Sequence, residues 1–262
     1  MVKTKSRIKH NTSLGQHFLR KQSTVDNMIN DVCITPETTV IEIGCGDGFL
    51  TRSILNQTPC KKLIIIELDS RWANFVEGTY GCKRLQVITA DALDYDYESL
   101  SEKKPIVLLA NLPYQITFPL FKKFVAHATL FSEAIVMLQE ETAQKIAAKK
   151  GRSYGALSLY FQHFFNISLM EKVEPQAFEP APKVTSRLLH FTPNTNRPEI
   201  ENLEGFWLFL RSLFKTPRQT LKNNLKRTSI DIKKVPKEYL TLRAQQLELP
   251  ALIALWNSVN TD

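Results

Sequence analysis

Short runs of isoleucine, valine and leucine alternate with segments of helical periodicity before residue 192. Four of these runs are typical of strands buried on both faces of a sheet, namely Thr39–Ile43, Leu63–Leu68, Leu85–Ile88 and Ile106–Ala110. The intervening segments predict helices at Phe49–Gln57, Ser70–Thr79 and Pro119–His127. A fifth run, Ala134–Leu138, leads into a predicted helix at Glu140–Lys150. This alternation predicts a doubly wound α/β domain with a mostly parallel sheet.

The pattern changes toward the C-terminus. Two strand-like runs, around Phe164–Val173 and Val184–Phe191, flank a proline-rich stretch and are compatible with an antiparallel pair at the end of the sheet. A linker follows near Thr192–Pro198, and beyond it apolar residues recur at helical spacing. We therefore expect a basic N-terminal arm at residues 1–21, an α/β domain at 22–192 and a smaller all-helical domain at 199–262.

The composition excludes several classes of protein. The chain has 262 residues and is 43% apolar, which is enough to bury a core, yet no apolar run approaches the roughly 20 residues of a membrane helix. The basic start lacks the apolar segment of a secretory signal, so we expect a cytoplasmic protein without a membrane span. The four cysteines show no paired spacing, and no His/Cys/Asp cluster has metal-ligand spacing, so reduced thiols and no metal requirement are expected.

The net charge of +8 is unevenly distributed. Residues 1–21 hold six Lys or Arg and no acid, and residues 211–237 hold nine with one acid. Arg218, Lys222 and Lys226 recur every four residues, so a helix with Pro217 in its first turn would align them on one face. Such a face is either a solvated surface or a track that binds nucleic-acid phosphates.

A glycine-rich loop follows the first predicted strand. Gly44, Gly46 and Gly48 stand at alternate positions after Glu42, which lets the backbone turn tightly and pass close to a ligand. A dinucleotide site is the obvious rival, but its fingerprint places the third glycine one residue further along. The spacing resembles motif I of class I methyltransferases that use S-adenosylmethionine (SAM). That resemblance implies a Rossmann-like fold, a SAM cofactor, and contacts from Gly44 and Gly46.

Acidic residues end the next two predicted strands. Glu67 can accept hydrogen bonds from both ribose hydroxyls of a cofactor, and Asp91 can accept one from the exocyclic amine of its adenine. We expect Asp69 to cap the following helix instead. Because strand ends line the ligand crevice of an open α/β sheet, these acids and the glycine loop are expected to form one SAM site.

The fourth strand runs into Asn111-Leu112-Pro113-Tyr114, which resembles motif IV of amino methyltransferases. An adenine amine is a poor nucleophile because its lone pair is delocalised into the ring. The Asn111 side-chain oxygen and the Leu112 or Pro113 carbonyl can each accept an N–H and so orient the amine. Pro113 stiffens the turn, and Tyr114 offers a ring on which the base stacks. The alternative is an ordinary turn after a strand.

Further segments resemble the ribosomal RNA adenine N6-dimethyltransferase family, and most closely its bacterial small-subunit (KsgA-type) branch. The resemblance extends over essentially the whole chain. The segments that carry it are Ser13–Leu19, Glu42–Gly48, Asn111–Thr117, Phe178–Val184 and Arg243–Leu247. The resemblance implies that His17 and Leu19 contact SAM together with Gly44, Glu67, Asp91 and Asn111. It also implies that Phe178 stacks on the target adenine opposite Tyr114, the alternative being a core aromatic.

One departure from the family pattern lies in the basic C-terminal segment. The chain keeps Thr220–Leu225 but has Pro217-Arg218-Gln219 where the family usually shows two arginines and a lysine. This change bears on RNA contacts by Arg218, Lys222 and Lys226 but not on the reaction.

Three functions follow from the resemblance. The first is SAM-dependent dimethylation of two adjacent adenines in small-subunit (16S) rRNA during ribosome assembly, by a monomer. The second is the related Erm-type methylation of large-subunit rRNA. The third is a non-catalytic RNA-binding assembly factor. The C-terminal motifs favour the first over the second, and the intact Asn111–Tyr114 segment and acids argue against loss of activity.

Overall fold

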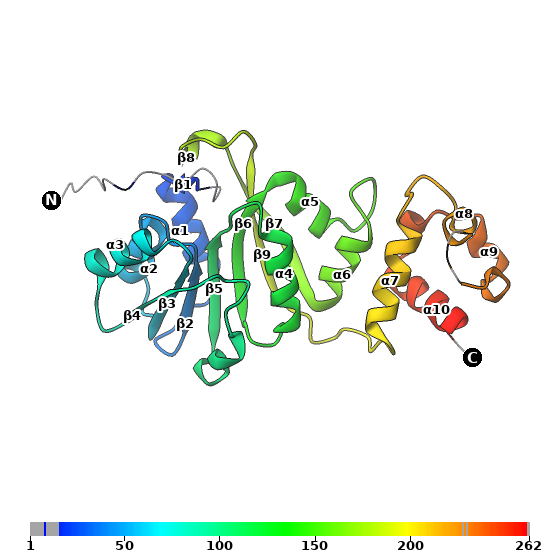
Figure 1. Ribbon diagram of the computed structural model, residues 1–262, viewed down its shortest axis with the longest axis horizontal. Helices are drawn as coiled ribbons and strands as arrows, with labels where there is room; N and C mark the ends of the chain where they lie inside the picture. The colour runs from blue at the N-terminus through cyan, green and yellow to red at the C-terminus, as the bar shows by residue number, and fades with distance from the viewer. Residues whose placement is uncertain (1–7, 9–15, 227, 229, 261–262) are drawn as a thin grey trace. The chain divides into compact units, whose positions relative to one another are not determined.

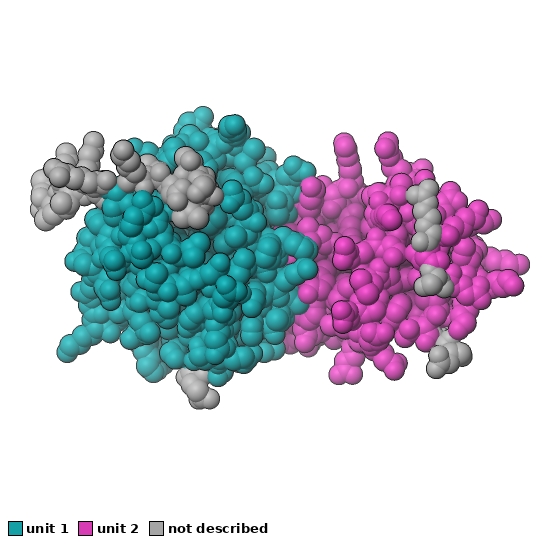
Figure 2. Space-filling model, viewed as in Figure 1, with its two compact units in different colours: residues 1–143, 165–193 teal, residues 144–164, 194–262 magenta. Residues whose placement is uncertain are grey.

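The computed structural model describes residues 8, 16–226, 228 and 230–260. Most of the predicted N-terminal arm, and the Ser13–Gly15 part of the family signature, lie outside these described residues. The chain forms two compact units, coloured separately in Figure 2. Unit 1 comprises residues 1–143 and 165–193, and unit 2 comprises residues 144–164 and 194–262.

A seven-stranded sheet forms the centre of unit 1 (Figure 1). Its order is β4-β3-β2-β5-β6-β9-β7. The first five of these strands are parallel, and β9 is antiparallel to both of its neighbours, β6 and β7. In chain order the strands are β2 (Thr39–Ile43), β3 (Lys62–Glu67), β4 (Leu85–Thr89), β5 (Ile106–Asn111), β6 (Glu133–Gln139), β7 (Phe165–Val173) and β9 (Ser186–Pro193). The order reverses between β2 and β5, and such a switch point is where open α/β sheets bind ligands.

The sheet confirms the predicted strand positions and the antiparallel pair at its end. β2 is buried along its whole length because β3 and β5 flank it and helices cover it. The expectation that Leu85–Ile88 is buried on both faces was wrong, since no residue of β4 is fully buried. The reason is topological: β4 pairs only with β3 and forms an edge of the sheet.

Helices cover both faces of the sheet, as the doubly wound pattern predicts. One face packs against α1 (Gln22–Asn30), α2 (Phe49–Gln57) and α3 (Ser70–Tyr80), which contribute Met28, Ile54 and Val76 to a shared apolar cluster. On the other face α4 (Thr117–Ala126) packs Phe121 against Phe191 of β9, with ring centroids 5.6 Å apart. The α1 helix was not among the predicted elements.

A separate two-stranded ribbon brings together segments that are far apart in the sequence. β1 (Phe18–Leu19) pairs antiparallel with β8 (Phe178–Glu179). The family signature near the N-terminus and the proline-rich segment before β9 therefore meet, which no local periodicity predicts.

Unit 2 is helical, as expected for the C-terminal domain. Its elements are the end of α5 (Glu140–Ala147), α6 (Ala156–Phe164), α7 (Leu203–Leu213), α8 (Leu221–Leu225), α9 (Lys237–Leu240) and α10 (Leu249–Asn260), with short 3-10 turns. Phe206, Leu210 and Leu255 lie in its core. The predicted boundaries need one correction, because residues 144–164 belong to unit 2 and interrupt the 22–192 domain. Tyr154 and Leu159 join the unit 2 core, which explains the correction.

The predicted helix that begins at Pro217 is wrong. Pro217 and Arg218 lie in a turn, and α8 begins only at Leu221. The buried Asn224 holds this turn, since its Oδ1 accepts a hydrogen bond from the Thr216 backbone N–H and its Nδ2 donates to the Thr216 oxygen. Leu221 and Leu225 are buried.

Candidate active site

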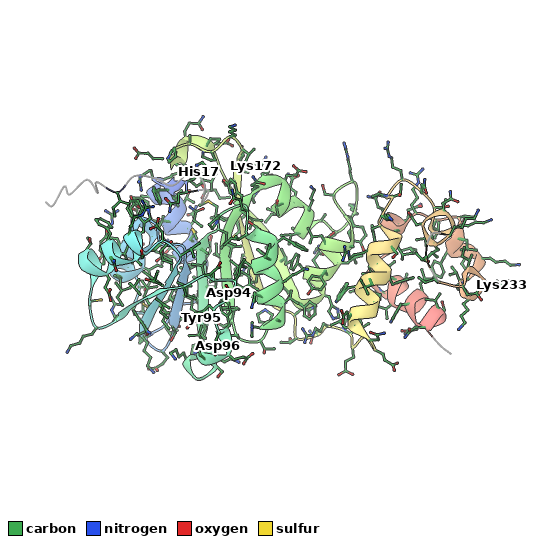
Figure 3. All side chains as sticks on the ribbon, viewed as in Figure 1. His17, Asp94, Tyr95, Asp96, Lys172 and Lys233 are labelled. Carbon is green, nitrogen blue, oxygen red and sulfur yellow. The ribbon has the colours of Figure 1, made fainter. Side chains whose placement is uncertain are left out.

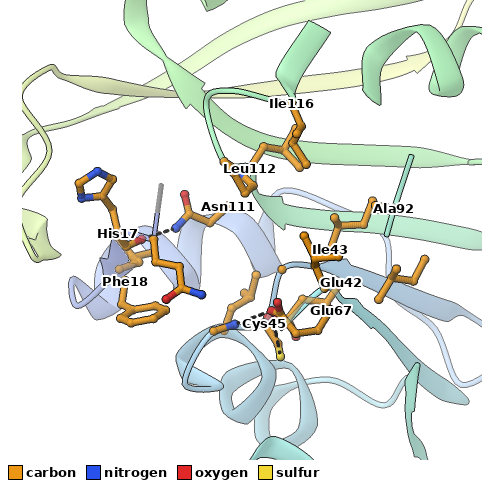
Figure 4. A pocket seen from close by; sticks show the side chains of 18 of the residues that line it. His17, Phe18, Glu42, Ile43, Cys45, Glu67, Ala92, Asn111, Leu112 and Ile116 are labelled. Carbon is orange, nitrogen blue, oxygen red and sulfur yellow. Dashed lines mark hydrogen bonds between the residues drawn. The ribbon is translucent and has the colours of Figure 1, made fainter. Parts of the chain in front are cut away.

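A pocket lies at the carboxyl ends of β2, β3, β4 and β5 in unit 1 (Figure 4). It is lined by every residue predicted to bind the cofactor, namely His17, Leu19, Gly44, Gly46, Glu67, Asp91 and Asn111. Leu112, Pro113 and Tyr114 line it too. The structure therefore brings motif I, the two strand-end acids and the Asn111–Tyr114 segment into one site.

The glycine loop after β2 adopts backbone conformations that favour glycine. Gly44, Gly46 and Gly48 have φ of 75°, 52° and 81°, a region that costs residues with a Cβ. A Cβ on Gly46 would collide with the ring of Phe18. Around Gly44 the nearest atom to such a Cβ would be the Asn111 backbone oxygen at 3.9 Å, which leaves room for a ligand against the backbone.

Glu67 is buried at the end of β3 and fixed by the loops around it. Its Oε2 accepts a hydrogen bond from the Gly46 N–H at 3.2 Å, and its Oε1 accepts one from the Asp69 N–H at 2.9 Å. Burial raises the pKa of Glu67, and these backbone donors oppose the shift. The Cys45 thiol also donates to Oε2 at 3.6 Å, whereas Oε1 has a second lone pair that can accept a hydroxyl of a ligand.

Glu42 is a second buried carboxyl group in the pocket wall. Burial raises its pKa to about 8, and the nearby charge of Glu67 adds to the shift. The Thr51 hydroxyl donates to Glu42 Oε2 at 2.7 Å and partly offsets this effect. Near neutral pH Glu42 is therefore largely protonated.

The other two acids each accept a local backbone hydrogen bond, and for Asp69 this confirms the expected cap. The Asp69 side chain caps α3 by accepting from the Arg71 N–H, and the Arg71 guanidinium beside it lowers the pKa of Asp69 to about 2. Asp91 accepts from the Leu93 N–H at 2.8 Å through Oδ1 and lines the pocket. Its second oxygen can serve a ligand while the first fixes the turn.

The Asn111 side chain is oriented by a backbone group from the N-terminal segment. Its Nδ2 donates to the His17 backbone oxygen at 3.0 Å. Because that carbonyl can only accept, the amide oxygen must point the other way, as Figure 4 shows. Asn111 therefore presents a fixed acceptor, which is what orientation of an amine requires.

The structure also distinguishes between the two candidate carbonyl acceptors. The Pro113 oxygen already accepts from the Ile116 N–H at 3.2 Å and from the Thr117 hydroxyl at 3.4 Å. These two donors occupy both of its lone pairs. Leu112 is consequently the better candidate for a second acceptor beside Asn111.

Tyr114 lines the pocket with its hydroxyl 2.7 Å from Ser186 Oγ. Burial raises the pKa of Tyr114, so the phenol is neutral at physiological pH. A neutral aromatic ring held at one end is suited to stack against a base.

Phe178 differs from the expectation. Its ring is 5% exposed and belongs to the apolar core cluster of unit 1. It is not part of the pocket lining, because β8 pairs with β1 and directs this position into the core. In this structure Phe178 is the core aromatic of the alternative interpretation.

Several pocket residues were missed by the sequence reasoning. Leu68 lines the pocket and is 54% exposed, an unusual exposure for leucine, and Ala92 and Ile116 also contribute apolar surface. Gln16 lines the pocket and donates to Asp69 Oδ2 at 3.2 Å. Leu68 and Ala92 directly follow the strand-end acids Glu67 and Asp91, and this position was the available signal.

The three cations predicted to bind RNA belong to unit 2, whereas the residues that line the pocket belong to unit 1. Arg218, Lys222 and Lys226 are all exposed. Lys222 belongs to α8, while Arg218 precedes it and Lys226 follows it. Lys233, labelled in Figure 3, adds to the positive charge of this unit. Within the described part of the chain, no group of three His, Cys, Asp or Glu side chains is arranged to hold a metal ion.

Comparisons with known proteins identify the family. A family model described as ribosomal RNA adenine dimethylase matches residues 7–242. A ribosomal RNA small subunit methyltransferase A from Chlorobium chlorochromatii is 34% identical over 250 residues, covering 95% of this chain and 93% of that protein. A protein of the same name from Sulfurihydrogenibium sp. is 30% identical over 260 residues, covering 98% and 99%.

Solved structures show the same fold. A dimethyladenosine transferase from Plasmodium falciparum matches with a TM-score of 0.80 and 27% identity, covering 93% of this chain and 98% of that chain. The 23S rRNA methyltransferase ErmE matches with a TM-score of 0.68 and 22% identity, covering 93% and 100%, and bears on the fold alone. The chain therefore belongs to the ribosomal RNA adenine dimethylase family and is a SAM-dependent enzyme with the class I methyltransferase fold.

Proposed function

We propose that this enzyme transfers methyl groups from SAM to N6 of two adjacent adenines in small-subunit (16S) rRNA during ribosome assembly. The observation that carries the proposal is the Asn111 amide, which lines the pocket together with the strand-end acids and whose nitrogen is held by the His17 backbone oxygen, so that its oxygen is left to accept. The small-subunit substrate is supported by two relatives, each named ribosomal RNA small subunit methyltransferase A.

The residues of the pocket fit a SAM molecule. Glu67 Oε1 has an available lone pair for a ribose hydroxyl, and Asp91 can accept from the adenine amine. Leu68 and Ala92 offer apolar surface beside them, and the loop at Gly44 leaves room for close approach. His17 and Leu19 complete the wall. When bound, SAM supplies the methyl group.

The Asn111–Tyr114 segment prepares the target amine. Asn111 Oδ1 and the Leu112 carbonyl accept its two N–H groups, which holds the amine in one orientation and favours localisation of its lone pair. Tyr114 stacks on the base and keeps it in the pocket. Because no protein nucleophile is needed, orientation is the main contribution of this segment.

The two units divide the work in this proposal. Unit 1 binds SAM and the target base, while residues 199–262 of unit 2 position the RNA through phosphate contacts that do not read its bases. We further propose that the enzyme acts as a monomer in the cytoplasm, where ribosomal subunits assemble. The described helices include none that is both long and apolar enough to cross a membrane.

A transfer assay with tritium-labelled SAM tests the proposal. Assembling small subunits, mature small subunits and protein-free large-subunit rRNA are offered as substrates in parallel. We expect label on N6-dimethyladenine in the assembling small subunits alone. Label on the large-subunit RNA would favour Erm-type activity instead, and RNA binding without transfer to any substrate would favour the assembly factor.

Replacing Tyr114 should affect RNA methylation far more than SAM binding. Stacking on a base contributes roughly 1–3 kcal/mol, so Tyr114→Ala should lower kcat/KM for RNA by roughly 5- to 150-fold. Tyr114→Phe should retain most of the rate, since it loses only the contact with Ser186. Phe178 provides the contrast, because Phe178→Ala removes a buried ring and should lower the unfolding temperature. Equal loss of activity in Tyr114→Phe and Tyr114→Ala would contradict stacking.

Reversing the charges of Arg218, Lys222 and Lys226 to Glu should weaken rRNA binding and flatten its salt dependence. Fewer counterions are released when fewer phosphates are neutralised. SAM affinity should not change, because the SAM pocket lies in unit 1.

The matched control reverses the charges of Lys83, Lys103 and Lys104. These exposed residues lie just before β4 and β5, at the amino ends of the strands, whereas the pocket lies at the carboxyl ends. Both variants are titrated with rRNA from low to moderate salt. If both show the same slope of log affinity against log salt, the RNA track lies elsewhere.

A further inference from the structure

The wall of the SAM pocket is rich in acids. It contains Glu42, Asp47, Glu67 and Asp91, whereas no lysine or arginine is among the described residues that line it. Near neutral pH SAM carries a sulfonium and an ammonium group against one carboxylate, so its net charge is +1. S-adenosylhomocysteine (SAH), which remains after methyl transfer, has lost the sulfonium charge and is neutral overall. The same acids therefore face two ligands that differ by one positive charge.

Three of the four acids have partners that favour their charged forms. Asp47 is paired with Arg20, whose guanidinium nitrogen lies 2.8 Å from a carboxylate oxygen. Backbone N–H groups donate to Asp91 and to both oxygens of Glu67. Charged partners and N–H donors both stabilise an ionised carboxylate. Glu42 has neither of these ion-pair or strand-end arrangements and is the acid whose charge is least supported.

Glu42 lies on β2 in the pocket wall and is 1% exposed. Its neighbours across the sheet are apolar, namely Ile65 on β3 and Leu109 on β5. Among the described residues, the side chain that donates to it is Thr51 of α2, at 2.7 Å. Such surroundings favour the neutral acid, and a positive charge that enters the pocket reverses that preference.

The titratable groups around Glu42 strengthen its preference for the neutral form. Burial raises its pKa to about 8, and the charges of Glu67 and Asp47 add to the shift. Burial also raises the pKa of the Cys45 thiol in the glycine loop, so this thiol stays neutral. The His17 ring, which belongs to the same lining, points away from Glu42 (Figure 4).

We propose that Glu42 is a specificity-determining residue, which holds a proton in the unliganded enzyme and releases it when the cationic SAM binds. The proton passes to solvent, and no covalent bond to the ligand forms or breaks. The carboxylate that results attracts the positive charge of SAM and gives no such advantage to neutral SAH. Once the methyl group has been transferred, Glu42 takes up a proton from solvent again, which favours release of SAH.

The affinity for SAM should therefore depend on pH. The contribution of Glu42 is largest above about pH 8, where the group is already ionised, and is lost as the pH falls. If SAM lowers the pKa of Glu42 by about one unit, its affinity rises by about tenfold between pH 6 and pH 9. The affinity for SAH should lack this rise. Calorimetric titrations across this range measure both, after each ligand's own titration has been subtracted.

Proton release can also be measured directly, by calorimetry at pH 7.5 in two buffers with different heats of ionisation. The unsubstituted enzyme should release about half a proton more on binding SAM than Glu42→Gln does. Glutamine keeps an oxygen for the Thr51 hydroxyl but cannot ionise. The variant should also lose the rise of SAM affinity with pH and bind SAH normally.

Glu37→Gln is the matched control. It is the same substitution in the turn before β2, at an exposed side chain that does not line the pocket. This variant should release as many protons as the unsubstituted enzyme and show the same pH dependence. Thermal unfolding is recorded for both variants.

Two results would overturn the inference. One is equal proton release by the unsubstituted enzyme and Glu42→Gln, and the other is the same pH dependence for SAM and SAH. If Glu42→Gln does not fold, the comparison of SAM with SAH on the unsubstituted enzyme decides the question. These experiments contain no RNA, so their outcome is independent of whether small-subunit rRNA is the substrate.

Discussion

Replacing Asn111 with alanine is expected to lower the single-turnover rate of methyl transfer by about 10²–10³-fold, as removal of one fixed polar group from an active site often does. The variant loses the oxygen that orients the target amine. SAM affinity should change by no more than a few-fold, because Glu67 and Asp91 remain in the pocket. Single-turnover rates at saturating SAM and isothermal calorimetry measure the two quantities separately.

Asn166→Ala is a suitable control for this prediction. Asn166 is also an asparagine whose Nδ2 donates to a backbone oxygen, that of Pro193 at 3.3 Å, but it lies on β7 outside the pocket. Its variant should react at the normal rate. Near-normal turnover in Asn111→Ala would refute the assignment of Asn111 to the target amine.

Replacing Glu67 with alanine is expected to weaken SAM binding by about 1.5–3 kcal/mol, or roughly 10- to 150-fold, because hydrogen bonds to a charged group are lost. The chain should remain folded, since burial of this carboxylate already disfavours its charged form. Calorimetry at matched thermal stability provides the measurement.

Asp69 offers the contrast for Glu67. It lies two residues further along, but its carboxylate is occupied by Arg71 and by the cap of α3. Asp69→Ala should therefore reduce stability and leave SAM affinity within a few-fold. If Glu67→Ala binds SAM normally, another group must serve the ribose.

The parts of the fold that local sequence determines were predictable. The parallel strands, α2 and the cap at Asp69 follow from hydrophobic periodicity and from side-chain chemistry within a few residues. The exposure of β4 could not be predicted, because it depends on which strand lies at the edge of the sheet. The helix expected at Pro217 failed because Asn224 holds the preceding residues in a turn through bonds to Thr216.

The residues of the site also differ in whether the sequence alone could predict their arrangement. The glycine loop, Glu67 and Asp91 were predictable because each directly follows its strand, and strand order then brings them together. The amide orientation of Asn111 was not, since its partner is a backbone oxygen 94 positions away in the sequence. The burial of Phe178 depends on the pairing of β8 with β1, which are even further apart in the sequence.

The interleaving of the two units constrains how the protein can be divided experimentally. A fragment ending at Pro193 contains all of unit 1 but also residues 144–164, which have their core partners in the deleted part. Tyr154 and Leu159 would lose Phe214, Leu210 and their other neighbours, and would expose apolar surface to water. Such a fragment should aggregate rather than report on the isolated methyltransferase unit. A usable minimal enzyme must replace residues 144–164 with a short polar connection, so that removing unit 2 takes two cuts in the gene rather than one.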